Sequence, residues 1–324
     1  MSFETEAPVR LSIAGNFPEQ FFLENLAVRH DNSLLISVVT RKELYYLPPI
    51  TADVTAKPAL LHIFEEMVAG IAEPAPGIFL VMTTNAYTTH TNHLFRLDLR
   101  GWSPGAPVTP EPILTLPKEV LSLNGCCALS RTVVLAADSF GGAIWRFDLD
   151  EEARHAAAKL WLKHDSMAQV DAGLPPPPQP GVNGVRYSAA LGHLYYTTTG
   201  QKLFMRVAVD PVTLAPTGEP EELGRGGMYD DFCLDEARGF AFVTLHRENR
   251  LDRLPLAPGA EAMPPLVGRP FDERLIGPSS AAWSRLPGEE GRVVLVTTDG
   301  GTTAPPQETA IVNAKVVRIE IERS

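Results

Sequence analysis

The sequence predicts an all-β protein, a six-bladed β-propeller of four-stranded blades. Two observations lead to this prediction. A unit of about 50 residues recurs six times along the chain, and each unit contains an apolar run of strand length. With 324 residues, of which 44% are hydrophobic, the chain can bury the core of one such domain, so we expect residues 1–324 to form a single domain.

Each unit begins at a short polar or glycine-containing corner that is followed by apolar residues. The corners are Glu24-Asn25-Leu26, Gly70-Ile71-Ala72, Asn124-Gly125-Cys126, Asn183-Gly184-Val185, Asp230-Asp231-Phe232 and Pro278-Ser279-Ser280. Their first residues follow one another at intervals of 46 to 59 residues. This spacing is regular enough to reflect structural repeats of blade size.

The second strand of each unit is a continuous apolar run rich in Val, Ile, Tyr and Thr. The six runs are 34–40, 78–84, 133–138, 194–199, 240–244 and 293–298. Runs of this kind are typical of strands that are covered on both faces.

The third strands alternate apolar and polar residues, as half-buried strands do. Examples are 93–98, 143–148 and 202–207, and the sixth is 315–320. The sixth unit then lacks a fourth strand, and residues 9–13 could supply one. We therefore expect an N-terminal strand to pair with the C-terminal blade and close the ring.

Two segments depart from simple strand patterning. Residues 151–159 favour a helix by intrinsic propensity, but 159–163 falls where other units have a fourth strand, so we predict a strand there. The Pro-rich stretch 175–180 leads into the corner at Asn183, and we expect it at the rim of the channel.

Composition excludes several classes of partner. The net charge of −11 disfavours nucleic acid, no stretch is apolar enough for a membrane helix, and the first residues lack the pattern of a secretory signal. Cys126, Cys127 and Cys233 form neither a disulfide framework nor a CxxC pair. We expect a cytoplasmic protein without an obligate protein partner.

Common catalytic motifs are absent from the chain. It contains no Gly-x-Ser-x-Gly elbow, no His-Glu-x-x-His and no phosphate-binding loop, so we expect no organic cofactor. The chemistry should instead lie at the corners, because the innermost strands of a propeller converge on its axis.

Four of the six corners carry a carboxylate or carboxamide, namely Glu24, Asn124, Asn183 and Asp230. Such oxygen ligands suit a hard divalent cation such as Ca²⁺, Mg²⁺ or Mn²⁺. Turn chemistry is an alternative for the two Asn-Gly corners, since Asn and Gly both tolerate left-handed backbone conformations. It explains Glu24 poorly, because Glu is not a turn residue.

At these residues the sequence resembles the senescence-marker-protein/gluconolactonase family over essentially the whole chain. The resemblance implies a propeller with one axial divalent ion, held here by Glu24, Asn183 and Asp230, with Asn124 near metal and substrate. The sequence segments Glu-Asn-Leu-Ala-Val-Arg29 and Asp-Asp-Phe232 are similar to those of a fungal branch of this family. This chain departs from the family at two motifs. Glu24-Asn25-Leu26 replaces the family's Glu-Gly-Pro, and Tyr229-Asp230-Asp231 replaces its Pro-Asp-Gly.

The residues that flank the corners are largely apolar or aromatic, where a sugar lactonase would carry polar groups. They are Phe22, Leu26, Cys126, Met228, Tyr229, Phe232 and Trp283. Together with Asn124 and Tyr187 they predict a pocket for a hydrophobic small molecule.

Three functions are compatible with these residues. The first is metal-assisted hydrolysis of a lactone or ester, in which Asp230 or Asp231 orients or deprotonates water. The second is a non-hydrolytic cyclase of fungal secondary metabolism, of the type that couples a quinone methide with a terpene by a hetero-Diels–Alder reaction. Tyr229, Tyr187 or an axial amide would then donate a hydrogen bond to the substrate. The third is a binding propeller without catalysis.

Overall fold

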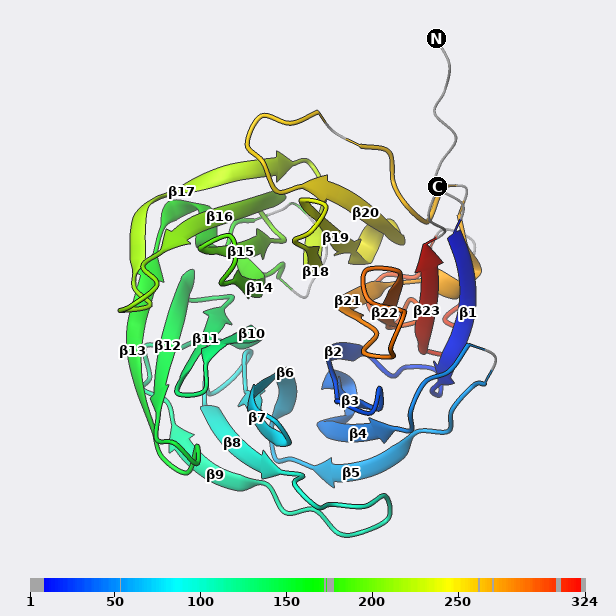
Figure 1. Cartoon of the computed structure of the whole chain (residues 1–324), viewed down its shortest axis with the longest axis horizontal. Helices are drawn as coiled ribbons and strands as arrows, with labels where there is room; N and C mark the ends of the chain where they lie inside the picture. The colour runs from blue at the N-terminus through cyan, green and yellow to red at the C-terminus, as the bar shows by residue number, and fades with distance from the viewer. Residues whose placement is uncertain are drawn as a thin grey trace.

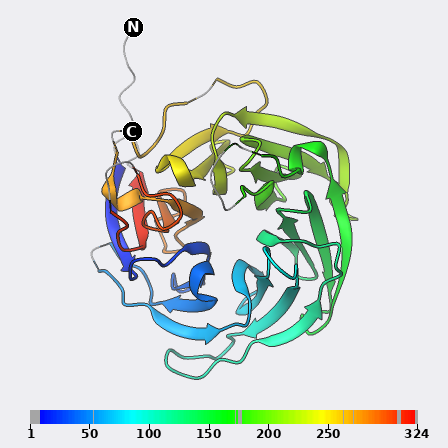
Figure 2. The same cartoon turned by 180° about the vertical axis from the view of Figure 1, so that it is seen from behind.

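Six antiparallel sheets surround a central axis in the computed structural model of the chain (Figure 1). The structure describes residues 9–52, 54–171, 173, 178–261, 263–269, 271–306 and 310–321. The sheets follow one another around the ring in sequence order (Figures 1 and 2). The innermost strand is the first strand of the sheet in five blades, and in the last blade it is the strand that begins at Pro278. The predicted six-bladed propeller is confirmed.

The first three blades each have four strands in sequence order. Blade one contains β2 (Leu23–Val28), β3 (Leu34–Val38), β4 (Glu43–Leu47) and β5 (Ala59–Ile63). Blade two contains β6 (Met67–Ala75), β7 (Ile78–Thr84), β8 (Asn92–Asp98) and β9 (Glu111–Thr115). Blade three contains β10 (Leu123–Ser130), β11 (Val133–Asp138), β12 (Ala143–Leu149) and β13 (Ala156–Lys163). The strand predicted at 159–163 is therefore present as part of β13.

The last three blades complete the ring. Blade four contains β14 (Val182–Ser188), β15 (His193–Thr198), β16 (Leu203–Val209) and β17 (Pro216–Arg225). Blade five contains β18 (Tyr229–Asp235), β19 (Phe240–Leu245) and β20 (Arg250–Pro255). Blade six contains β21 (Pro278–Trp283), β22 (Val293–Thr298), β23 (Lys315–Ile321) and, as its outer strand, β1 (Val9–Asn16). The predicted closure is confirmed by the pairing of β1 with β23, which runs from Val9 opposite Ile321 to Asn16 opposite Lys315.

In the described part of the chain, four short 3₁₀ turns lie between strands. They are η1 (Val39–Arg41), η2 (Asp165–Met167), η3 (His246–Glu248) and η4 (Glu273–Leu275). None of the helical segments in the described part of the chain has the length and apolar character needed to cross a membrane.

Blade five corrects the expectation of four strands throughout. Its described residues form three strands and a single bridge between Leu251 and Val267. The segment after β20 contains Pro258, Pro264 and Pro265, which lack the N–H that a ladder requires. Proline content thus explains why the repeat is incomplete here.

The core consists of six apolar clusters, one between each pair of neighbouring blades. The second strands supply much of it, since β7, β11 and β22 are buried along their whole length. Each fully buried Val, Leu or Phe stabilises the fold by about 1.5–3 kcal/mol relative to an exposed one. The predicted double coverage of these strands is confirmed.

Every inner strand carries a β-bulge near its start. In β14, for example, Val182 pairs with Thr198 and Val185 with Tyr196, so that Asn183 and Gly184 lie opposite Thr197 alone. The same register shift occurs at residues 24–25, 69–70, 124–125, 230–231 and 279–280. Two of the predicted corners are therefore one residue out of register, because the bulges begin at Ala69 and Ser279.

A hydroxyl group opposite the bulge satisfies the extra backbone N–H in four blades. The hydroxyls of Ser37, Thr197, Thr244 and Thr297 accept from residues 25, 184, 231 and 280 at 2.9–3.1 Å. Thr244 also donates to the carbonyl of Ser279, and Thr297 to that of Glu24, so the hydroxyls link neighbouring blades. This arrangement fixes the direction of the bulge residues.

The Asn-Gly corners are bulges within strands, and close packing explains their glycines. Gly125 and Gly184 have negative φ, so they are not left-handed turn residues. A Cβ on Gly184 would lie 2.5 Å from Asp231 Oδ1, and one on Gly125 would lie 2.6 Å from the Asn183 carbonyl. Glycine is needed here because the inner strands approach one another at the axis.

Candidate functional site

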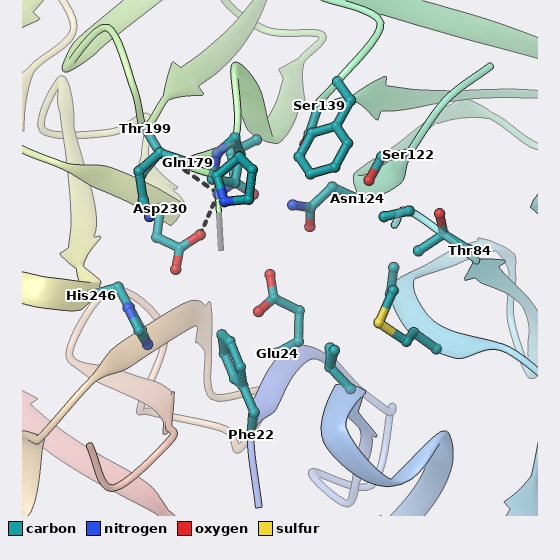
Figure 3. A pocket seen from close by; sticks show the side chains of 18 of the residues that line it. Phe22, Glu24, Thr84, Ser122, Asn124, Ser139, Gln179, Thr199, Asp230 and His246 are labelled. Atoms are coloured by element: carbon teal, nitrogen blue, oxygen red, sulfur yellow. Dashed lines mark hydrogen bonds between the residues drawn. The ribbon is translucent and has the colours of Figure 1, made fainter. Parts of the chain in front are cut away.

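The first residues of the six bulges form a ring around one end of the axis. They are Glu24, Ala69, Asn124, Asn183, Asp230 and Ser279. The first five line a pocket of about 860 Å³ that includes its open mouth, which we call the axial pocket. Figure 3 shows Glu24, Asn124 and Asp230 pointing toward its centre.

Segments that directly follow the second strands form part of the wall of the axial pocket. Antiparallel pairing brings the end of each second strand beside the start of the inner strand. Tyr87, Phe140, Thr199 and His246 reach the pocket in this way, and Phe22, Met67 and Met228 reach it from just before or at the start of the inner strands. The walls are mainly apolar around a polar centre.

Asn183 and Asp230 are in direct contact. Asn183 Nδ2 donates to Asp230 Oδ1 at 2.5 Å and to Thr199 Oγ1 at 2.9 Å, while Thr199 donates to the Tyr229 carbonyl. Burial, together with the charges of Glu24 and Asp231, raises the pKa of Asp230 well above its usual range. The Asn183 amide is therefore fixed by its neighbours.

Glu24, which only blade six separates from Asp230 around the ring, shares this electrostatic environment. Burial raises its pKa to about 7, the charge of His246 opposes that rise, and the carboxylates of Asp231 and Asp299 add to it. Two carboxyl groups with raised pKa values thus face one pocket, which is an arrangement that a proton or a cation stabilises.

Asn124 is the axial amide that remains open to a ligand. Its Oδ1 is buried without a hydrogen-bond partner, and its Nδ2 makes no hydrogen bond with any other residue that the structure describes. Figure 3 shows the side chain directed into the pocket. It is the axial amide best placed to donate to a bound molecule.

A histidine that the repeat pattern did not indicate also faces the pocket. His246 Nε2 lies 3.1 Å from Asp299 Oδ2, and its ring stacks on Phe22 at 5.2 Å between centroids. Asp299 accepts from the backbone N–H groups of Gly301 and Thr303. Although burial favours a raised pKa for Asp299, the charge of His246 and these hydrogen bonds lower it. The position of His246 directly after a second strand was the signal that could have identified it.

The predicted substrate-binding residues divide between two ends of the axis. Phe22, Asn124 and Met228 line the axial pocket with Glu24, Asn183 and Asp230. A separate cavity, which we call the opposite cavity, is lined by Leu26, Cys126, Tyr187 and Trp283. These four residues lie two or more positions farther along the inner strands, and each position adds about 3.3 Å. None of the four is among the residues that line the axial pocket.

Asp231 lies between the two cavities. Its Oδ2 is 2.5 Å from Arg186 Nη2 and also accepts from Ser280. The side chain is only 3% exposed, and Asp231 is not among the residues that line either cavity. The ion pair with Arg186 makes it part of the packed middle of the axis, away from a ligand in the axial pocket.

Tyr229 and Phe232 belong to the core between blades four and five. Phe232 packs edge-on against Phe204, and the Arg186 guanidinium lies over its ring. Burial, with the charge of Asp252, raises the pKa of Tyr229 to about 12. Neither side chain lines the axial pocket.

The predicted metal ligands fit a hard cation by the chemistry of their donors. Glu24 and Asp230 are buried carboxylates with raised pKa values, and Asn183 touches Asp230. Asn183 currently directs its nitrogen to Asp230, so its oxygen would have to turn inward to ligate. Among the described residues, no three His, Cys, Asp or Glu side chains are grouped closely enough to hold a metal. A cation here would depend on the amide ligands.

The end of the Pro-rich stretch lies at the pocket. Pro178, Gln179 and Pro180 line the axial pocket, as expected for the channel rim. Pro175–Pro177 lie outside the described residues.

Comparison with known proteins gives one related sequence and several similar folds. No family model matches the chain. The candidate hetero-Diels-Alderase asR5 of Sarocladium schorii is 24% identical over 336 aligned positions, covering 92% of this chain and 80% of that protein.

Solved structures with a similar fold include enzymes and a calcium-binding protein. A luciferin-regenerating enzyme superposes with a TM-score of 0.67 at 17% identity, covering 94% of this chain and 92% of its own. A calcium-binding regucalcin from Agrobacterium tumefaciens gives 0.61 at 15%, covering 96% of both chains. A gluconolactonase from Xanthomonas campestris gives 0.60 at 13%, covering 97% of this chain and 90% of its own. The chain therefore shares its fold with gluconolactonase-like propellers.

Proposed function

We propose that this protein is an enzyme that couples an oxadiene with an alkene in a hetero-Diels–Alder reaction. The observation that carries the proposal is the axial pocket, where mainly apolar walls surround an amide donor, Asn124, that is open to a ligand. The relationship to a candidate hetero-Diels-Alderase supports it. This was the second of the functions compatible with the sequence.

The reaction suits a pocket of this composition. An o-quinone methide and an alkene form a dihydropyran ring through one new C–O bond and one new C–C bond, and no atom leaves. No nucleophile, leaving group or redox equivalent is required. Acceleration comes from holding the two reactants in contact and from a hydrogen bond to the oxadiene oxygen.

Asn124 is assigned the role of hydrogen-bond donor to that oxygen. Tyr229 lies in the core and Tyr187 in the opposite cavity, so neither reaches the axial pocket. Asn183 is already bonded to Asp230 and Thr199. Of the donors considered from the sequence, the Asn124 amide is the one that fits the proposed reaction.

The placement of nucleophilic side chains away from the axial pocket also suits an electrophilic substrate. Quinone methides alkylate thiols and amines. Among the described residues, the axial pocket is lined by neither Cys nor Lys, and the three cysteines line the opposite cavity. Burial raises the pKa of Cys127 to about 12 and those of Cys126 and Cys233 further. This arrangement keeps thiolates away from the reactive partner.

The experiment that tests the proposal measures coupling by protein from which metal has been removed. An o-quinone methide released in buffer is offered to an electron-rich alkene, with and without EDTA-treated protein. We expect faster formation of the cycloadduct with the protein, at equal rates before and after EDTA treatment. Coupling no faster than in buffer would contradict the proposal.

Metal-assisted lactone hydrolysis is the second candidate, favoured by the convergence of Glu24, Asn183 and Asp230. These residues would hold a divalent cation, which when bound would polarise a lactone carbonyl. Asp230 is buried at the pocket floor and would orient the attacking water. Hydrolysis of a lactone panel that requires Ca²⁺, Mg²⁺ or Mn²⁺ and is lost in Asp230→Asn would favour this reaction over coupling.

A further inference from the structure

Arg247 brings a positive charge to the axial pocket and has no partner among the described residues. It lies in the 3₁₀ turn η3 directly after β19, is partly buried and lines the pocket. It makes no hydrogen bond or ion pair with any residue that the structure describes. No other Lys or Arg is among the described residues that line this pocket. A guanidinium that loses contact with water without gaining an anion costs free energy, so a ligand could supply the missing group.

The residues on either side of Arg247 are held by other partners. His246 forms the ion pair with a carboxylate of blade six that is described above. Glu248 accepts from the Met228 N–H at 2.9 Å with one oxygen, and its other oxygen lies 2.9 Å from Arg250 Nη2. The turn is therefore fixed on both sides, and the carboxylate next to Arg247 in the chain is already occupied.

The carboxylates of the site do not neutralise Arg247 either. Burial lowers the pKa of Arg247, and the charge of Asp299 opposes this change, whereas Glu24 and Asp230 do not shift it. Asp299 is itself held by His246, by two backbone N–H groups and by a hydroxyl of the loop that follows it. The positive charge of Arg247 thus remains available to a ligand.

The fold does not require an arginine at this position. The turn η1 (Val39–Arg41) follows the second strand of blade one as η3 follows that of blade five. Both turns end at a residue with positive φ, which is 61° at Lys42 and 53° at Asn249. Thr40 stands in η1 where Arg247 stands in η3, and Thr40 does not line the axial pocket. The arginine therefore belongs to the pocket of this protein and is not part of the structural repeat.

We propose that Arg247 binds the carboxylate group of a small molecule in the axial pocket. The planar guanidinium can direct two parallel N–H groups to the two carboxylate oxygens. The mainly apolar walls accommodate the rest of the molecule, so the ligand is an organic acid with an apolar body. This charge preference goes beyond the proposed coupling reaction, which requires no acidic group on either reactant.

The test compares two acids with their uncharged amides, namely 2-naphthoate with 2-naphthamide and octanoate with octanamide. Calorimetry on the full-length protein measures the four affinities in the presence of EDTA, which prevents a carboxylate from binding through a metal ion. We expect at least one acid to bind about 10-fold more tightly than its amide, as for a charge-assisted hydrogen bond. Equal affinities for acid and amide in both pairs, or no binding of any of the four, would overturn the proposal.

Charge-removing variants assign the preference to Arg247. Arg247→Gln should weaken binding of the acid about 10-fold and leave the amide within about 2-fold, whereas Arg247→Lys, which keeps the charge, should retain part of the preference. Arg269→Gln is the matched control, because Arg269 is exposed and does not line the axial pocket. Equal losses in Arg247→Gln and Arg269→Gln would assign the effect to net charge and contradict the proposal.

A stability measurement tests whether Arg247 has a structural role instead. Because it has no partner among the described residues, its replacement leaves no buried group unsatisfied. We therefore expect Arg247→Gln to melt at the temperature of Arg269→Gln or above it. A clearly lower melting temperature for Arg247→Gln would contradict the absence of a partner from which the proposal is argued.

The carboxylate site and the coupling reaction can fail separately. If acids are preferred through Arg247 but no cycloadduct forms, the coupling reaction is wrong and the carboxylate site stands. If cycloadduct forms and acids are not preferred over amides, the coupling stands and the carboxylate site is wrong.

Discussion

At the scale of single residues, the sequence predicted which side chains approach the propeller axis better than it predicted how far along the axis each one lies. Glu24, Asn183 and Asp230 were expected together, and they meet at the axial pocket. Trp283 and Tyr187 were expected with them but line the opposite cavity. The corner pattern fixes which residues approach the axis, whereas their depth depends on how many residues separate them from the bulge.

The hydrogen bond from Asn124 can be tested with an isosteric change. Asn124→Asp keeps the size of the side chain but removes its N–H donors, so we expect the coupling rate to fall about 100-fold, as for loss of one preorganised donor. Asn25→Asp, at the second bulge residue of blade one, is a control for the same chemical change, because Asn25 does not line the axial pocket. An Asn124→Asp variant as fast as the wild type would exclude this role.

The raised pKa of Glu24 predicts how stability depends on pH. Its folded-state pKa of about 7 exceeds the ordinary value of 4.5, so the folded protein binds more protons between these values. Stability should therefore be greatest below about pH 4.5 for this group and fall as pH rises through 7, by at most roughly 3 kcal/mol. Melting temperatures of metal-free protein measure this slope, which Glu24→Gln should reduce. An unchanged slope in Glu24→Gln would assign the effect to other groups.

At the scale of elements, the β-bulge is the feature that builds the site. It adds one residue to each inner strand, and in five of the six blades the first residue of the bulge lines the axial pocket. The repeat predicted where these corners lie in four blades and missed by one residue at Ala69 and Ser279. In blade two the predicted corner residue, Gly70, is the second residue of the bulge. Glycine is needed there because the Asn124 carbonyl packs against it.

The hydroxyl groups opposite the bulges should stabilise the fold measurably. Thr244→Val keeps the shape of the side chain but leaves the buried N–H of Asp231 without a partner, which costs about 1–3 kcal/mol. Thr83→Val is the matched control, because the Thr83 hydroxyl is buried and has no partner among the described residues. Urea unfolding should show a loss for Thr244→Val and little change, or a gain, for Thr83→Val. Equal losses in both would mean that the hydrogen bond is not the cause.

At the scale of the whole molecule, the periodic pattern was sufficient to predict the propeller. Six apolar second strands and an unassigned N-terminal strand predict six blades and their closure, and both are confirmed. The described residues of blade five form three strands, and this was not predicted because a regular repeat conceals the local effect of Pro258, Pro264 and Pro265. His246 escaped notice because its partner Asp299 comes from another blade.

The measurement that tests the central claim most directly is the enantiomeric excess of the cycloadduct formed by EDTA-treated protein. A chiral pocket that holds both reactants beside Asn124 should give one enantiomer in clear excess, and Asn124→Ala and Phe22→Ala should both lower that excess. A racemic product at the rate seen in buffer would contradict the claim. If the same protein hydrolysed lactones only with a divalent cation present, the axial pocket would be that of a lactonase.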